Sequence, residues 1–127
     1  MRRVVITGIG IVSSIGNNKE EVTDSLRLGK SGITLSETYR DMGFRSHVHG
    51  EPTVDIEANM DRKLRRFMGD GAAYNYIAMA EAITDAGLND DEVSDVRTGL
   101  IMGSGGPSVR NVIQSADAAR ERGPKKV

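Results

Sequence analysis

The chain of 127 residues lacks cysteine and tryptophan and has only two phenylalanines and three tyrosines. Without cysteine it holds no disulfide, no zinc–thiolate site and no cysteine nucleophile, and this absence fits a reducing compartment. The scarcity of aromatic residues excludes a core built mainly from large rings. Fifteen glycines instead favour elements whose backbones pack closely together.

Long apolar runs are also missing. No segment approaches the ~18 apolar residues of a membrane-spanning helix, and the run from Val4 to Thr7 is too short for a secretory signal. The net charge is −1, from 17 Lys and Arg against 18 Asp and Glu. We therefore expect neither a membrane nor nucleic acid as a partner.

Two apolar segments predict buried strands. Arg3 to Gly8 contains consecutive apolar residues, and Thr98 to Gly106, "TGLIMGSGG", has the same character and ends in glycines. Consecutive apolar positions are typical of strands that are covered on both faces. Residues 30–60 show no sustained period and predict loops, with a short strand near Ser46 to His49.

Helix start and stop signals organise the rest of the chain. Asn18 is predicted to cap a helix that ends at Gly29, with Glu21 placed for a capping box. Asp61 is predicted to cap the longest helix, residues 62–86. Each of these helices therefore has a recognisable beginning in the sequence.

The middle of the longest predicted helix is apolar on all sides. Gly71 to Ala80, "GAAYNYIAMA", has Asn75 as its only strongly polar residue, and Gly87 ends the helix. A helix without a polar face is buried, so we expect it inside a layered α/β fold. Pro107 suits the first turn of a last helix. Two buried strands do not make a stable sheet, so we expect a larger fold or completion by another chain.

The stretch "VVITGIGIVSSIGNN" has two readings. Gly8 and Gly10 fit the first two glycines of a dinucleotide fingerprint, but Ser13 stands where the third belongs. The alternative is a strand whose glycines let a neighbouring backbone approach closely, and the residues favour it. Similarly, "GSGGPS" at 103–108 could bind phosphate at a helix start but lacks the lysine of a P-loop. Such a run more often lets a ligand chain or another backbone pass.

Four cations stand within five residues at a predicted helix N-terminus: Arg62, Lys63, Arg65 and Arg66. The helix macrodipole disfavours positive charge there. Together with the free N–H groups of the helix start, the cations form a local anion-attracting patch. The patch is either an ordinary charged face or a docking patch for an acidic partner, which salt would weaken.

The only two histidines form an H-x-H pair, His47 and His49, that a strand would place on one face. A metal site needs further ligands at suitable spacing, and Glu51 alone is thin support. We therefore assign no metal site.

Five motifs occur in one order: "VVITGIGIVSSIGNN", "KSGIT", "FRSHVHG", "DRKLRRFMGD" and "GLIMGSGG". This combination closely resembles the N-terminal third of the β-ketoacyl-acyl-carrier-protein synthases, and "SSIGNN", "RSHV" and "RFM" look like the type I condensing enzyme. The resemblance runs along essentially all 127 residues. It implies a thiolase-like layered α-β-α-β-α fold, of which residues 1–127 are the incomplete N-terminal part of the first half.

The resemblance also implies a function. The family transfers an acyl group from carrier protein to a cysteine, decarboxylates malonyl-carrier protein and condenses the two in fatty-acid elongation, with histidines stabilising the oxyanion. Its members are cytoplasmic homodimers that need no nicotinamide or metal cofactor. The catalytic cysteine and histidines lie beyond residue 127, so no catalytic residue is assigned here and this chain alone is expected to be inactive.

Some binding residues carry over by position. By this resemblance, acyl carrier protein would dock on Arg62, Lys63 and Arg66. Lys125 and Lys126 match a basic loop near the path of the carrier protein. Arg65 is an extra cation relative to the family. In the glycine segment, Gly105 and Gly106 would border the acyl pocket, although Pro107 departs from the longer glycine run of the family. His47 matches a position that is not catalytic.

Two other functions remain open from the sequence. The first is a non-catalytic subunit that resembles a chain-length factor, because some relatives lack the nucleophile and shape product length as a dimer partner. The second is an NADPH-dependent reductase, which the two N-terminal glycines suggest. A cysteine encoded after a third strand would favour the enzyme, whereas saturable NADPH binding would favour the reductase.

Overall fold

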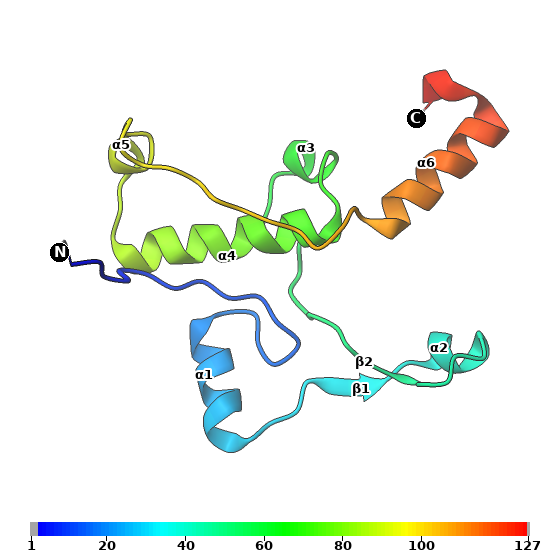
Figure 1. Cartoon of the computed structure of the whole chain (residues 1–127), viewed down its shortest axis with the longest axis horizontal. Helices are drawn as coiled ribbons and strands as arrows, with labels where there is room; N and C mark the ends of the chain where they lie inside the picture. The colour runs from blue at the N-terminus through cyan, green and yellow to red at the C-terminus, as the bar shows by residue number, and fades with distance from the viewer. Residues whose placement is uncertain (1–2, 127) are drawn as a thin grey trace.

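The computed structural model describes residues 3–126 and is built around one central helix, α4 (Figure 1). The N-terminal segment, blue in Figure 1, runs along one side of α4, and the segment that follows α5 runs along another. The β1–β2 hairpin and α6 extend from this centre. In chain order the elements are α1 Lys19–Leu28, β1 Ile33–Leu35, α2 Glu37–Asp41, β2 Val48–Gly50, α3 Arg62–Arg65, α4 Asp70–Ala86, α5 Asp90–Val93, α6 Val109–Arg122 and the 3₁₀ turn η1 Pro124–Lys126.

Helix α1 begins and ends where the sequence predicts. The Asn18 side chain accepts a hydrogen bond from the Glu21 backbone N–H at 2.9 Å. The Glu21 carboxylate accepts from the backbone N–H of Asn17 at 2.8 Å, one residue before the cap, so the reciprocal bond differs from a strict capping box. Gly29 closes the helix with φ at 63°, a left-handed conformation that glycine adopts without cost.

The single helix predicted over residues 62–86 is wrong, because the chain turns between α3 and α4. Asp61 caps α3 as predicted, accepting from the Lys63 backbone N–H at 2.7 Å. The Arg65 guanidinium then donates to the Met68 carbonyl oxygen and to the Asp70 carboxylate, the latter at 2.6 Å. These bonds stabilise a turn before Gly69, which has a low helix propensity and becomes the N-cap of α4. Gly87 ends α4 as predicted, with φ at 68°.

The prediction of two buried strands, 3–8 and 98–106, is wrong for this chain, because neither segment pairs with another strand within residues 3–126 and their apolar side chains are largely exposed, Val4 by 93% and Ile101 by 98%. A segment becomes a β-strand only by hydrogen bonding to a neighbouring strand. In residues 3–126 this pairing joins β1 and β2, which run antiparallel with Thr34 opposite His49. The strand predicted near Ser46 to His49 is confirmed over its last two residues, in β2.

The apolar residues are only partly covered. In α4, Ala73 and Ile77 are buried, whereas Tyr76 is 40% exposed, so the helix is central but not covered on all sides as predicted. Pro107 does not enter α6. Ser108 caps that helix instead, accepting from the Asn111 backbone N–H at 3.4 Å.

Candidate functional site

The N-terminal glycines pack against the backbone of α4, and this contact contradicts a nucleotide-binding loop. A Cβ built on Gly8 would lie 2.2 Å from the Ala82 carbonyl oxygen, and one built on Gly10 would lie 1.8 Å from that of Ala78. Both distances are impossible for a side chain, so only glycine lets this segment lie against α4. The interpretation of these glycines as sites of close backbone approach is confirmed.

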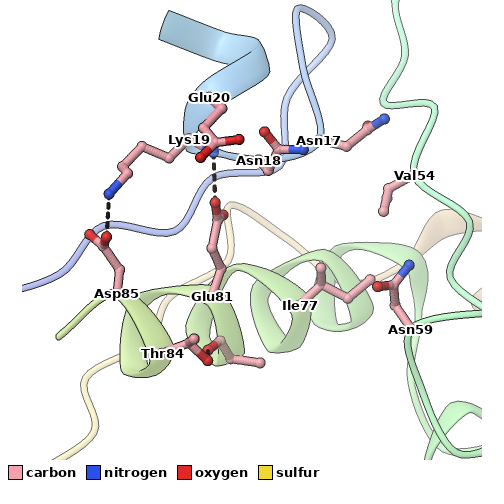
Figure 2. Close-up of a pocket in the computed structure, with 11 residues that line it drawn as sticks. Asn17, Asn18, Lys19, Glu20, Val54, Asn59, Ile77, Glu81, Thr84 and Asp85 are labelled. Carbon is pink, nitrogen blue, oxygen red and sulfur yellow. Dashed lines mark hydrogen bonds and ion pairs between the residues drawn. The ribbon is translucent and has the colours of Figure 1, made fainter. Parts of the chain in front are cut away.

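Two carboxylates of α4 hold the same segment through its backbone. Asp85 accepts from the Ile9 N–H at 3.0 Å, and Glu81 accepts from the N–H groups of Ile11 at 2.8 Å and Lys19 at 2.6 Å. Lys19 Nζ also forms an ion pair with Asp85 (Figure 2). The helix rises about 6 Å over four residues, and an extended chain covers nearly the same distance in two. Glu81 and Asp85 therefore match alternate N–H groups.

The Lys19–Asp85 pair shifts both titrations in the direction expected of an ion pair. The hydrogen bond from Lys19, followed by that from the Ile9 N–H, lowers the pKa of Asp85 below its ordinary 3.8. The hydrogen bond to Asp85 raises the pKa of Lys19 above 10.5. A cavity of about 670 Å³ lies beside the pair (Figure 2), but both carboxylates already have partners. We therefore assign this cluster a structural role.

Sequence reasoning missed Glu81 and Asp85. The signal was present, because two acidic residues four apart lie on one face of a helix that is otherwise poor in charge. Their partners are backbone N–H groups 62 to 76 residues away. No local pattern identifies such partners.

The predicted docking cations lie on α3 and its C-cap and on η1, and two of them line one groove. A groove of about 520 Å³ between α3 and α6 is lined by Arg66 and Lys126, with three further basic residues. Arg62, Lys63 and Lys125 are exposed but do not line it. The three further basic residues are Arg65, Arg110 and Arg122.

The charges of this groove are only partly neutralised. Asp70 pairs with Arg65 at 2.6 Å and with Arg110 at 3.4 Å. Arg65 is therefore turned inward, with its side chain only 23% exposed, and does not belong to the solvated patch. Within residues 3–126, Arg66 and Lys126 have no carboxylate within ion-pair distance, so the groove attracts anions. Arg66 lies 5.8 Å from the ring centre of Phe67, in cation–π range.

A second cavity, of about 860 Å³, lies between α4 and the extended segment before α6. Gly106 lines it, whereas Gly105 does not. The Ser104 hydroxyl donates to the Gly106 carbonyl oxygen at 2.7 Å and shapes the turn. The large apolar side chains that line it are those of Met68, Tyr76, Met79, Leu100, Met102 and Val112. This lining suits an apolar ligand chain.

The histidine pair does not gather metal ligands. His49 packs edge-on against Tyr39, with ring centres 5.6 Å apart, and its Nε2 lies 3.8 Å from a Glu51 carboxylate oxygen. Between residues 3 and 126, no three His, Cys, Asp or Glu side chains cluster as metal ligands. The same range contains no helix with the length and apolar character needed to cross a bilayer.

Comparisons with known proteins agree along the whole chain. The family described as "Beta-ketoacyl synthase, N-terminal domain" matches residues 1–126. The chain is 54% identical over its full length to 3-oxoacyl-[acyl-carrier-protein] synthase 1 of Haemophilus influenzae, and 52% identical over 98% of its length to the protein of that name from Escherichia coli K12. Identity to 3-oxoacyl-[acyl-carrier-protein] synthase 2 of Vibrio cholerae is 34%.

The fold comparison gives the same result. The crystal structure of a beta-ketoacyl synthase from Burkholderia phymatum matches 100% of the chain with a TM-score of 0.79 at 30% identity, and confirms the expected thiolase-like α/β class. The chain covers 32% of that structure, and 31% and 30% of the Haemophilus and Escherichia proteins. It thus spans about a third of the length of these relatives. The chain belongs to the β-ketoacyl synthase family, of which it matches the N-terminal domain.

Proposed function

We propose that a protein that joins this chain to the remaining two thirds found in its relatives is a β-ketoacyl-acyl-carrier-protein synthase of type I, active in fatty-acid elongation. The higher identity to the two synthases named 1 than to the synthase named 2 supports the type. The reaction would be acyl transfer to a cysteine followed by decarboxylative condensation with malonyl-carrier protein. This chain has no cysteine, so the nucleophile would come from outside these 127 residues.

One observation supports a specific role for this chain: the basic groove and the apolar cavity are adjacent. Met68, Asp70 and Asn111 line both of them. A partner that delivers an apolar chain on an acidic protein needs such a basic surface beside an apolar pocket. We assign acyl carrier protein docking to Arg62, Lys63, Arg66, Lys125 and Lys126, and the border of the acyl pocket to Gly105 and Gly106.

Three further features belong to this proposal. Residues 1–127 would form the N-terminal part of a thiolase-like domain, the whole protein would be a homodimer, and it would act in the cytoplasm. The exposed apolar residues of residues 3–8 support the first feature, because Val4 and Ile6 are 93% and 84% exposed and need a neighbouring strand.

The docking assignment is tested with the double variant Arg62→Glu, Arg66→Glu in the whole protein. Reversing two cations should weaken binding of acyl carrier protein and raise the KM for carrier-bound acyl groups, while transfer from a small carrier-free thioester changes little. Arg97→Glu is the control for reversal of one exposed cation away from the patch, since the Arg97 side chain is 89% exposed and lies on the segment after α5. Equal loss with both substrates would mean that the patch is structural.

The enzymatic assignment has its own test. The purified 127-residue chain should not condense acyl and malonyl groups, and the whole protein should. If the whole protein lacks the cysteine and binds carrier protein but has no condensing activity, it would instead be the chain-length-factor-like subunit. Saturable NADPH binding measured by calorimetry would favour the reductase and contradict the proposal.

A further inference from the structure

The first residue of α4, Asp70, links α3, which carries Arg62 and Lys63 and has Arg66 as its C-cap, to α6, which leads directly into η1 with Lys125 and Lys126. Its Oδ1 lies 2.6 Å from Arg65 Nη2 at the end of α3, and its Oδ2 lies 3.4 Å from Arg110 Nη1 in the first turn of α6. Arg65 also donates to the Met68 carbonyl oxygen within the turn between α3 and α4. One carboxylate therefore connects α3, α4 and α6.

A second contact brings the same two helix starts together. A Cβ built on Gly69 would lie 2.7 Å from Ser108 Cβ and 3.2 Å from Ser108 Oγ. Gly69 and Ser108 are the N-caps of α4 and α6. The missing side chain at Gly69 therefore lets α6 begin beside Asp70, where Arg110 reaches the carboxylate.

We propose that Asp70 is a positioning residue that holds α3 and α6 at the spacing at which Arg66, on one wall of the groove, and Lys126, on the other, contact one acidic partner together. The proposal rests on the docking function proposed above. Asp70 does not touch the partner in this proposal. It acts through Arg65 and Arg110, with which it pairs and which it holds in place.

Electrostatics alone gives the opposite expectation, which makes the proposal testable by sign. Asp70 is a negative charge inside a positive groove, so its removal makes the groove more positive and should tighten binding of an acidic protein. If Asp70 positions the walls, its removal frees Arg65 and Arg110 and weakens binding despite the added positive charge. An isolated exposed ion pair contributes little to stability. If the pairs of Asp70 with Arg65 and Arg110 behaved in that way, the loss of positioning would not exceed the gain from the added positive charge.

The experiment measures binding of fluorescently labelled acyl carrier protein to the whole protein by anisotropy, with KM and kcat for carrier-bound acyl groups measured in parallel. We expect Asp70→Asn to raise Kd and KM about fivefold with kcat within about twofold. The control is Asp117→Asn, which removes the same charge from α6, where Asp117 pairs with Arg120 of its own helix. The control should leave Kd unchanged or slightly lower.

Two further variants separate the explanations. In the background Arg65→Gln, Arg110→Gln, Asp70→Asn should add little, because its effect passes through those arginines. Tighter binding by Asp70→Asn, or an effect that is fully additive in that background, would overturn the proposal. Arg66→Glu, measured in the same assay, tests the docking function itself. If Arg66→Glu weakens binding and Asp70→Asn does not, only the positioning role fails; if Arg66→Glu changes nothing, the docking function fails.

Discussion

The two extended segments beside α4, residues 3–11 and 98–106, share a sequence character but differ in what their glycines do. In the first, Gly8 and Gly10 have helix backbone where a side chain would stand. In the second, Gly99, Gly103, Gly105 and Gly106 have no atom within 4 Å of a built Cβ. The same pattern of apolar run and glycine therefore serves close packing at one end of the helix and leaves open space beside a cavity at the other.

The difference extends to hydrogen bonding. The first segment donates its Ile9 and Ile11 N–H groups to carboxylates of α4, at 3.0 and 2.8 Å. Among residues 3–126, the hydrogen bonds of the 103–106 glycine segment are local, between Ser104 and Gly106. Packing and the hydrogen bonds from Ile9 and Ile11 hold the first segment against α4, whereas the glycines of the second segment border open space. The following predictions test this contrast, beginning with the largest effect.

Substitution of Gly10 by alanine should produce the largest loss of stability. The new methyl group would meet the Ala78 carbonyl oxygen at 1.8 Å, so the segment must leave the helix. We expect the free energy of unfolding to fall by roughly 2–3 kcal/mol, the upper part of the range for overpacked sites. Chemical denaturation of the whole protein measures this fall, with Gly99→Ala as the control. Equal stability of the two variants would remove the contrast between the segments.

Removal of the Glu81 carboxylate should lower the free energy of unfolding slightly less than the substitution at Gly10 does. Glu81→Ala leaves the partly buried N–H groups of Ile11 and Lys19 without their acceptor, which should lower the free energy of unfolding by about 2 kcal/mol. Glu121→Ala on the exposed face of α6 is the control and should have little effect. Hydrogen exchange at the two N–H groups should accelerate only in Glu81→Ala. Unchanged exchange there would contradict the anchoring role.

The Lys19–Asp85 pair should make anchoring depend on pH. The pKa of Asp85 is lower in the folded chain than its ordinary 3.8, so its contribution is present above 3.8 and is lost as the pH falls through the folded value. The pKa of Lys19 is raised above 10.5, so its contribution is lost as the pH rises through that raised value. The stability advantage of the wild type over Asp85→Asn should therefore be present at neutral pH and disappear in acid. A constant difference from pH 7 to pH 2 would contradict this.

The glycines beside the cavity should affect specificity more than stability. Gly105→Ala and Gly106→Ala should each change the free energy of unfolding by less than about 0.5 kcal/mol, because the space beside both is open. Only Gly106 lines the cavity, so Gly106→Leu should lower kcat/KM for long acyl groups relative to short ones, and Gly105→Leu should do so less. Unchanged chain-length selectivity in Gly106→Leu would mean that the cavity does not receive the acyl chain.

Local signals in the sequence predicted much of this fold. Neighbours in the sequence determine the helix caps at Asn18 and Asp61. The properties of glycine itself, which adopts a left-handed backbone and has no side chain, explain the helix ends at Gly29 and Gly87 and the close packing at Gly8 and Gly10. The break before α4 was not predicted, because it depends on a guanidinium of Arg65 that leaves the helical face to reach the next turn. Propensity alone does not register such a bond.

The limits of sequence reasoning at the site are of the same kind. The cluster of cations at 62–66 was visible, but its division into an inward Arg65 and an outward Arg66 was not, since Asp70 and Arg110 decide it. That Arg66 and Lys126 share a groove depends on how α3 and α6 approach. The family resemblance supplied the residues, and the packing of helix starts explains how two distant parts of the chain face each other.

The match between two helical carboxylates and two alternate N–H groups has a consequence for self-association. An extended segment has two edges, and an edge with unpaired N–H groups can recruit a strand from another molecule. Glu81 and Asp85 occupy the edge of this segment that carries the N–H groups of Ile9 and Ile11. The helix therefore blocks this edge, and a new strand can pair with residues 8–11 only along the opposite edge. The packing of α4 thus determines on which side of this segment a sheet can extend.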